Sequence, residues 1–190
     1  SLQAGLRYLL AAMLGSFIYL LGVALVYSKA GVLDFYLLSG LAEPGPAWIV
    51  AFGLMVFGLA LKSALLPFHF WLPPAHSNAP APVSAILSAL VIKASFFLLL
   101  RVWFTVFAGI TRIPSGQILG IFIALMGAAA VLWGSLQAIR QIRMKPLIAY
   151  STVGQLGYLF LIFALVSGPG TKAWGSTAWS GTLFYAVSHC

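Results

Sequence analysis

The chain has 190 residues, of which 62% are hydrophobic and only 6% are charged, and its mean hydropathy is +1.06. Soluble globular domains carry about 25% charged residues, so this composition excludes that class. Apolar windows of about 18 residues or more recur along the chain, and an α-helix needs that length to cross a bilayer. We therefore expect an all-α polytopic membrane protein.

The net charge of +8 comes from ten Lys and Arg residues against Asp34 and Glu43. The basic residues fall mostly at the ends of apolar segments, where they set membrane topology, so we expect a lipid bilayer around the chain and no nucleic-acid partner. The single cysteine, Cys190, cannot build a disulfide or metal framework. The chain begins without Met and stops inside an apolar run. We therefore expect residues 1–190 to be part of a single transmembrane domain, truncated at both ends.

Six membrane spans are predicted in chain order. The first contains Gly15, Ser16 and Gly22, small residues of the kind that let transmembrane helices pack closely. The second follows a loop that ends in Glu43-Pro44-Gly45-Pro46, a strong helix break. The predicted spans cover residues 6–27, 48–68, 83–104, 117–137 and 147–166, and a sixth begins near residue 178.

A proline-rich segment, residues 67–82, separates the second predicted span from the third. No regular helix passes through five prolines so spaced. Two structures fit this pattern: a turn at the membrane surface, or a broken helix folded into the protein. The prolines are Pro67, Pro73, Pro74, Pro80 and Pro82.

Basic residues between the spans predict the topology. The densest cluster is Arg140, Arg143 and Lys145, so we place it in the cytoplasm as a topological anchor. Counting spans back from this cluster puts the proline-rich segment and the amino terminus on the same side. The opposite side then holds Lys29, Arg112 and Lys172.

Lys62 and Lys93 lie inside apolar sequence on either side of the proline-rich segment. At 1.5 Å per residue both lie roughly 12 to 20 Å into the membrane, so we expect the two amines to face each other at similar depth. A low-dielectric environment favours the neutral form of an amine, and an amine that exchanges protons suits a proton relay. The alternative is that each lysine reaches an interface, or pairs with an acid elsewhere in the protein.

The three histidines are further candidates for proton transfer. His69 and His76 lie in the proline-rich segment, where they either feed protons to Lys62 or cap the turn by hydrogen bonding. His189 either belongs to a relay inside the membrane or packs as a hydrogen-bonded side chain. Two histidines in the turn are too few convergent ligands for a metal site, so we expect no metal.

A polar stripe interrupts the predicted span at residues 147–166, and it includes Thr152. It lines a hydrated path in one interpretation and holds neighbouring helices together in the other. No nucleophile constellation, phosphate loop or cofactor motif occurs in the chain, and we expect no cofactor. The residues that we single out for the path are Tyr150, Ser151, Gln155 and Tyr158.

Three segments carry a resemblance to a known family. The longest is LKSALLPFHFWLPPAHSNAPAPVSAILSALVIK, and the others are LIAYSTVGQLGY and FYAVSH. They resemble the proton-translocating antiporter-like membrane subunits of respiratory complex I, membrane-bound hydrogenases and Mrp-type sodium/proton antiporters. The family pattern is a lysine, P-h-H-x-W-L-P-x-A-H, A-P-x-P-V-S-A and a second lysine. The resemblance covers nearly the whole chain.

The resemblance implies a fold and roles for particular residues. Family members contain inverted helical repeats, so the chain would be a piece of that fold. Lys62 matches the lysine of the broken helix in the family. Lys93 matches the lysine that links one half-channel to the next, and His189 matches a histidine on the central polar axis. The essential glutamate of the family belongs to a span before Ser1. Pro74 stands where many members have an acid, and RQIRMKP lacks an aspartate, and both departures weaken an assignment to a named subfamily. The Pro-Pro-Ala-His form and the unbroken apolar span at residues 83–104 look more like the D-type Mrp subunit.

The resemblance also implies a function. We expect translocation of protons, or exchange of sodium ions for protons, by a multi-pass subunit of a multisubunit complex in a bacterial inner membrane. Any redox chemistry, as in an NADH:quinone oxidoreductase, would lie in other subunits, because this chain has no catalytic motif. Two alternatives are a non-pumping structural scaffold of such a complex and an unrelated secondary transporter.

Overall fold

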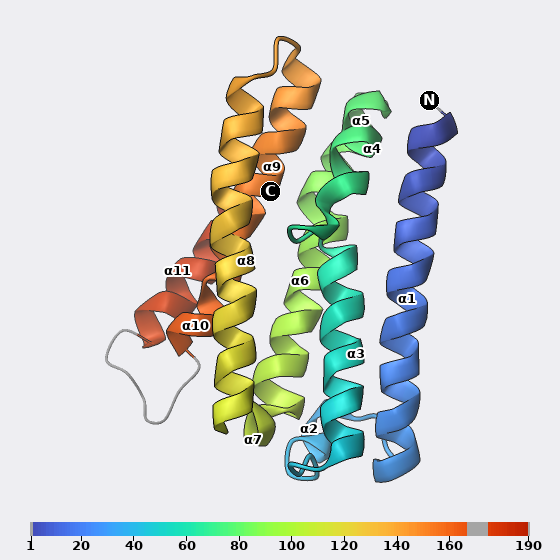
Figure 1. Ribbon diagram of the computed structural model, residues 1–190, viewed down its shortest axis with the longest axis vertical. Coiled ribbons are helices and arrows are strands. Elements are labelled where there is room, and N and C mark those ends of the chain that lie inside the picture. Colours follow the sequence, from blue (N-terminus) through green and yellow to red (C-terminus); the bar gives the residue numbers. More distant parts are fainter. Residues whose placement is uncertain (1, 167–174, 190) are drawn as a thin grey trace.

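The computed structural model describes residues 2–166 and 175–189, and these residues form a bundle of helices (Figure 1). The all-α prediction is confirmed. In chain order the elements are α1 Leu2–Ala30, α2 Phe35–Leu38, α3 Pro46–Lys62, the 3-10 helix η1 Phe68–Trp71, α4 Leu72–Asn78, α5 Ala81–Ile86, the π-helix η2 Leu87–Val91, α6 Ile92–Arg101, the π-helix η3 Val102–Val106, α7 Ala108–Thr111, α8 Pro114–Ile139, α9 Met144–Phe160, α10 Ile162–Val166 and α11 Gly175–Ser188.

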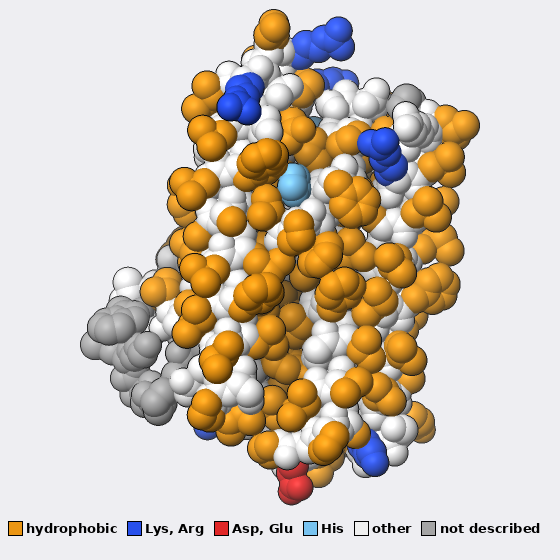
Figure 2. Space-filling view, in the orientation of Figure 1, with side chains coloured by type: hydrophobic (Ala, Val, Ile, Leu, Met, Phe, Trp, Pro, Cys, Tyr) orange, Lys and Arg blue, Asp and Glu red, His pale blue; other side chains and the backbone are white. Residues whose placement is uncertain are grey.

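Four continuous helices in the described part of the chain are long and apolar enough to cross a membrane. Their surfaces agree with a membrane location, because Figure 2 shows a face covered largely by hydrophobic side chains, with basic side chains near its two ends. The long helix over residues 81–106 includes both π-helices. The four spans are Leu2–Ala30, Ala81–Val106, Pro114–Ile139 and Met144–Val166.

The second predicted span is shorter than expected. Helix α3 ends at Lys62, not near residue 68, because Ser63 leaves the helix and Ala64 takes a left-handed conformation with φ of 54°. Pro67 then lacks the amide hydrogen that would continue the helix. The chain resumes in η1 and α4, so α3 and α4 are two halves of one broken helix (Figure 1).

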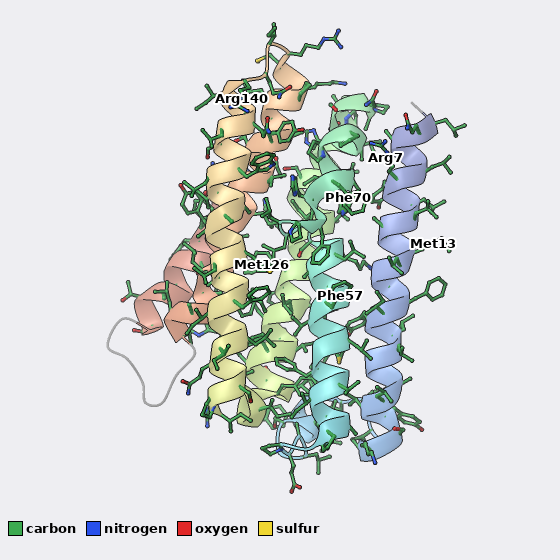
Figure 3. All side chains as sticks on the ribbon, viewed as in Figure 1. Arg7, Met13, Phe57, Phe70, Met126 and Arg140 are labelled. Atoms are coloured by element: carbon green, nitrogen blue, oxygen red, sulfur yellow. The ribbon has the colours of Figure 1, made fainter. Side chains whose placement is uncertain are left out.

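The loops lie at the two ends of the bundle, and the amino terminus, the end of the proline-rich segment and the basic cluster share one end, as the sequence predicted. Figure 1 places the amino terminus, the α4–α5 junction and the α8–α9 turn at one end, and α2 and α7 at the other. Arg7 and Arg140, labelled in Figure 3, lie near the first end. Lys172 lies outside the described residues. The cytoplasmic location of the first end stays a prediction.

Close helix packing depends on glycines, as expected for the first span. A Cβ atom at Gly58 of α3 would lie 2.6 Å from the Gly15 carbonyl oxygen and 2.7 Å from the Tyr19 amide nitrogen of α1. A Cβ atom at Gly22 of α1 would lie 2.9 Å from the Ala51 carbonyl oxygen of α3. Only a residue without a side chain fits such contacts, so α1 and α3 touch backbone to backbone.

Gly58→Ala should separate α1 from α3. Its new methyl group meets backbone atoms that cannot rotate away, so we expect a loss of about 1–3 kcal/mol in the free energy of unfolding. Gly53→Ala on the same helix is the matched control, because nothing lies within 4 Å of its added Cβ. Thermal unfolding of the full-length protein measures both changes. Equal midpoints for the two variants would contradict the packing described here.

Candidate functional site

The break after α3 is buried inside the protein. Ser63 and Ala64 are fully buried, and Leu72 at the start of α4 is also 0% exposed. Of the two structures compatible with the proline-rich segment, this is therefore the broken helix and not a surface turn. Ala64 has a conformation that a residue with a Cβ atom seldom adopts, and such strain is concentrated at functional sites.

The carbonyl groups at the end of α3 have hydrogen-bond donors. The indole Nε1 of Trp71 donates to the Leu61 oxygen at 3.0 Å. The amides of Ser63 and Leu65 donate to the oxygens of Leu59 at 2.8 Å and Ala60 at 3.1 Å. A helix end in an apolar medium needs such partners, so Trp71 acts as the cap of the broken helix.

Lys62 is the last residue of α3, and its amine reaches α1. Nζ donates to Ser16 Oγ at 3.1 Å, while Ser16 Oγ donates its own hydrogen to the Ala12 oxygen at 2.8 Å. The aliphatic stem crosses Gly15, where a Cβ atom would lie 2.6 Å from Lys62 Cγ. Ser16 therefore presents a lone pair to the amine, at a helix C-terminus where the macrodipole favours a positive charge.

Lys93 lies in the first turn of α6, directly after the π-helix η2. Its side chain is buried, with 8% exposed. Its amine is close enough for its charge to act on the imidazole of His189, which follows α11. Lys62 thus reaches α1, and the expectation that the two amines face each other stays a prediction.

The histidines of the broken segment differ in burial. His76 in α4 is 4% exposed, whereas His69 in η1 is half-buried. Among the described residues, Nδ1 of His69, Nδ1 of His76 and Nε2 of His189 are buried without a hydrogen-bond partner. Buried polar atoms are normally paired, so these three nitrogens are available for an exchangeable proton or a water molecule.

The polar stripe of α9 contacts the core through a residue that the predicted path did not include. Thr152 is 1% exposed, and its hydroxyl lies 3.3 Å from that of Ser88 in η2. Tyr158 is 48% exposed and packs its ring against Tyr185 at 5.8 Å. The remaining predicted path residues, Tyr150, Ser151 and Gln155, are half-buried.

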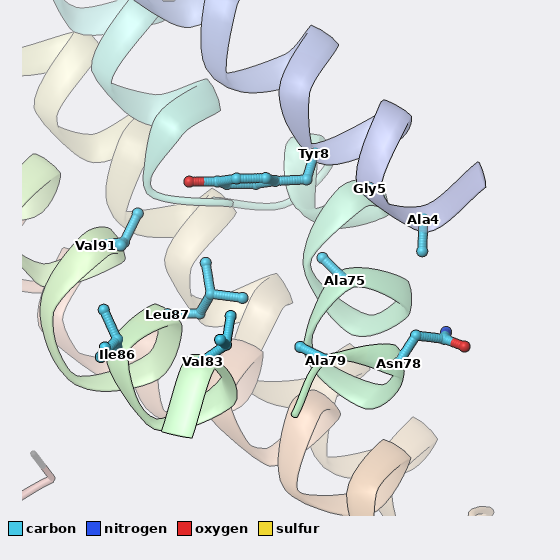
Figure 4. A pocket seen from close by; sticks show the side chains of 10 residues that line it. All are labelled: Ala4, Gly5, Tyr8, Ala75, Asn78, Ala79, Val83, Ile86, Leu87 and Val91. Atoms are coloured by element: carbon cyan, nitrogen blue, oxygen red, sulfur yellow. The ribbon is translucent and has the colours of Figure 1, made fainter. Parts of the chain in front are cut away.

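A cavity of about 340 Å³ lies between α1 and the helices that follow the break (Figure 4). Tyr8 forms part of its wall, and the Tyr8 ring packs on Trp71 with 5.4 Å between centroids. The lining is otherwise almost entirely apolar and includes Asn78. The aromatic pair thus lies between this cavity and the end of α3.

No group of three possible metal ligands occurs among the residues that the structure describes.

Residues 1–190 match the sequence model of the family described as NADH:quinone oxidoreductase/Mrp antiporter, TM. The chain belongs to this family. Its curated relatives include NADH-quinone oxidoreductase subunit N of Ectopseudomonas mendocina (strain ymp), 34% identical over 92% of this chain and 35% of the relative. Subunit N of Desulforudis audaxviator (strain MP104C) is 37% identical over 100% of this chain and 36% of the relative.

Solved structures of the family share the fold. One is a chain of the Mrp complex from Dietzia sp. DQ12-45-1b, with a TM-score of 0.84, 30% identity, and coverage of 99% of this chain and 33% of the other. Another is a chain of respiratory complex I from Thermus thermophilus, with a TM-score of 0.66, 32% identity, and coverage of 99% and 39%. The chain spans about a third of the length of these relatives. The resemblance to antiporter-like subunits is confirmed, and the chain is part of a multi-pass membrane subunit.

Trp71→Phe should destabilise the broken helix. It keeps an aromatic ring but removes the N–H that pairs with the Leu61 carbonyl, and a buried acceptor without a donor costs about 1–3 kcal/mol. Trp133→Phe is the control, because Trp133 is 45% exposed on α8. The thermal unfolding midpoint of the full-length protein should fall for Trp71→Phe alone. A midpoint equal to that of Trp133→Phe would reject the cap.

Proposed function

We propose that this chain belongs to a subunit that moves protons across the membrane, alone or in exchange for sodium ions, and that Lys62 and Lys93 carry the protons. The observation that supports this most directly is the place of the two amines. Lys62 stands at the end of a broken helix inside the bundle, and Lys93 is buried beside a second titratable group. Ionisable groups at such depth are expensive and usually belong to an ion pathway.

The two acidic residues of the chain do not neutralise these lysines. Asp34 caps α2, where its carboxylate accepts from the amides of Tyr36 and Leu37 at 2.8 and 3.1 Å. Glu43 lies in the loop before α3, at the opposite end of that helix from Lys62. These two carboxylates are therefore not the groups that set the protonation of Lys62 or Lys93 in the proposed relay.

Lys62 holds a proton in a defined place. The Ser16 hydroxyl gives its own hydrogen to Ala12, so toward Lys62 it acts as an acceptor, which suits the charged amine. The α3 dipole acts in the same direction. In this proposal a proton leaves Lys62 through one of the other hydrogens on Nζ and not through Ser16.

Lys93 and His189 form a site that favours transfer. Two positive charges close together in an apolar medium repel strongly, so a proton that arrives at one group promotes release from the other. Nε2 of His189 has no hydrogen-bond partner among the described residues and can accept a proton. In this proposal the pair passes protons onward, whereas Lys62 stores one.

We propose that the full-length subunit works inside a multisubunit membrane complex. Its relatives are named as subunit N of NADH-quinone oxidoreductase and as part of an Mrp complex. Purification of the full-length protein with its native partners separates the two types of parent complex. Soluble redox subunits in the complex would indicate the first type, and small membrane subunits alone would indicate the second.

Replacement of either lysine should abolish driven proton movement. The measurement uses the full-length complex in sealed vesicles, comparing Lys62→Ala and Lys93→Ala with wild type at equal assembly. Because a positioned proton-transfer group typically contributes about 100-fold or more to a rate, we expect losses of that order. Lys29→Ala, which removes an exposed lysine from the last turn of α1, should pump like wild type.

Normal pumping by both lysine variants would reject the relay. The chain would then be a structural scaffold within its complex, with the lysines serving only in helix packing.

A further inference from the structure

Lys145 makes a contact that a topological anchor does not require. Its Nζ donates to the Ala79 carbonyl oxygen at 2.9 Å, which links the first turn of α9 to the end of α4 across 66 residues of sequence. Lys145 and Arg143, two residues earlier, are both exposed, so this contact and not burial distinguishes Lys145. The basic residues of this turn are therefore not equivalent.

The end of α4 needs donors from outside the helix. Ala79 follows the last residue of α4 with extended backbone (φ −78°, ψ 155°), and Pro80 has no amide hydrogen to offer. Ser84 Oγ donates to the His76 carbonyl at 2.8 Å and makes a longer contact of 3.4 Å with the Ala79 carbonyl oxygen. The Lys145 amine supplies a donor and a positive charge at the Ala79 carbonyl, where the dipole of α4 favours a cation.

A second polar contact lies on the same face of α9. Thr152 follows Lys145 by seven residues, about two helical turns, and its hydroxyl lies 3.3 Å from Ser88 of η2. Ser88 belongs to the π-helix that immediately precedes α6 and Lys93. Helix α9 thus contacts the chain on both sides of Pro80, at the end of α4 and at the start of the helix that carries Lys93.

His76 belongs to the last turn of α4, three residues before Ala79. Its imidazole is buried, with 4% of the residue exposed, and its carbonyl is held by Ser84. Helix α4 also packs against α9. Movement of the end of α4 away from α9 would therefore displace His76 and disturb the η2 segment together.

We infer that Lys145 is a positioning residue that fastens the second half of the broken helix to α9, and so fixes His76 and the segment leading to Lys93. The effect on transport rests on the proposed function. The fastening itself is independent of that function and is measured separately.

Thiol labelling tests the fastening. Ala79→Cys places a thiol at the contact without removing the carbonyl, and its reaction with a small polar maleimide is followed in the full-length complex, against the complex without the added cysteine. Lys145→Met keeps an unbranched side chain but removes the amine, and it should speed labelling about fivefold, the change expected for one lost hydrogen bond of ordinary net strength. Lys145→Arg should restore slow labelling. Arg143→Met removes the same charge from the same turn and should label like wild type.

Driven proton movement gives the second readout, on the same variants without the added cysteine. Lys145→Met should lower it several-fold at equal assembly, with rescue by Lys145→Arg and no change in Arg143→Met. Where Lys145→Met reduces the amount of assembled complex, the nearly isosteric Thr152→Val replaces it in the labelling assay, with faster labelling again expected.

The outcomes separate the two proposals. Unchanged labelling in Lys145→Met and Thr152→Val overturns the fastening, whatever the lysines of the relay do. Equal effects of Lys145→Met and Arg143→Met also overturn it, because loop charge alone would then explain them. Faster labelling in Lys145→Met, together with normal pumping by Lys62→Ala and Lys93→Ala, supports the fastening and rejects the relay.

Discussion

The structure depends on one constraint, that backbone polar groups away from water need hydrogen-bond partners. A helix broken inside the bundle leaves carbonyl groups without intrahelical donors at the end of α3, and α4, the second half, leaves further ones where it ends after Asn78. The Trp71 indole pairs with the Leu61 oxygen at the end of α3, and Lys145 pairs with the Ala79 oxygen at the end of α4. Because both ends are capped by side chains, the break is a fixed feature of the fold, and it leaves Lys62 at a helix terminus inside the protein.

Backbone contact between helices places the polar groups around the break. Glycines let α1 approach α3 so closely that the stem of Lys62 crosses Gly15, and the amine then meets Ser16 one residue further along α1. Helices α8 and α9 also pack on glycines, since a Cβ atom at Gly134 would lie 2.5 Å from the Gly154 amide nitrogen. Such packing holds α9 in place, so that Thr152 meets Ser88. Small residues thus determine which polar side chains come together.

Local signals in the sequence predicted the spans, the break and the two central lysines. Apolar length and proline spacing are properties of short stretches, so they need no knowledge of the fold. The end of α3 at Lys62 was missed because Ser63 and Ala64 are not helix breakers by type. The partners of the polar side chains were also missed, since Ser16 lies 46 residues from Lys62, and Ser88 lies 64 residues from Thr152. Single hydroxyls in an apolar sequence give no signal of which helix they will contact. The position of Thr152 seven residues after Lys145 was the available sign that both share a face.

The two lysines have different neighbours, and in the proposed relay they therefore take different parts. Lys62 has a hydroxyl acceptor and a helix C-terminus, both of which lower the free energy of its charged form. Lys93 has a neighbouring imidazole, and a second positive charge there raises the free energy of the doubly protonated state. In the proposed relay, Lys62 is therefore the site with a fixed hydroxyl partner, and Lys93 is the site whose charge acts on a second titratable group. The chain between the two lysines contains the break, α4 and the contacts with α9, so a change at the break would act on the segment that leads from Lys62 to Lys93.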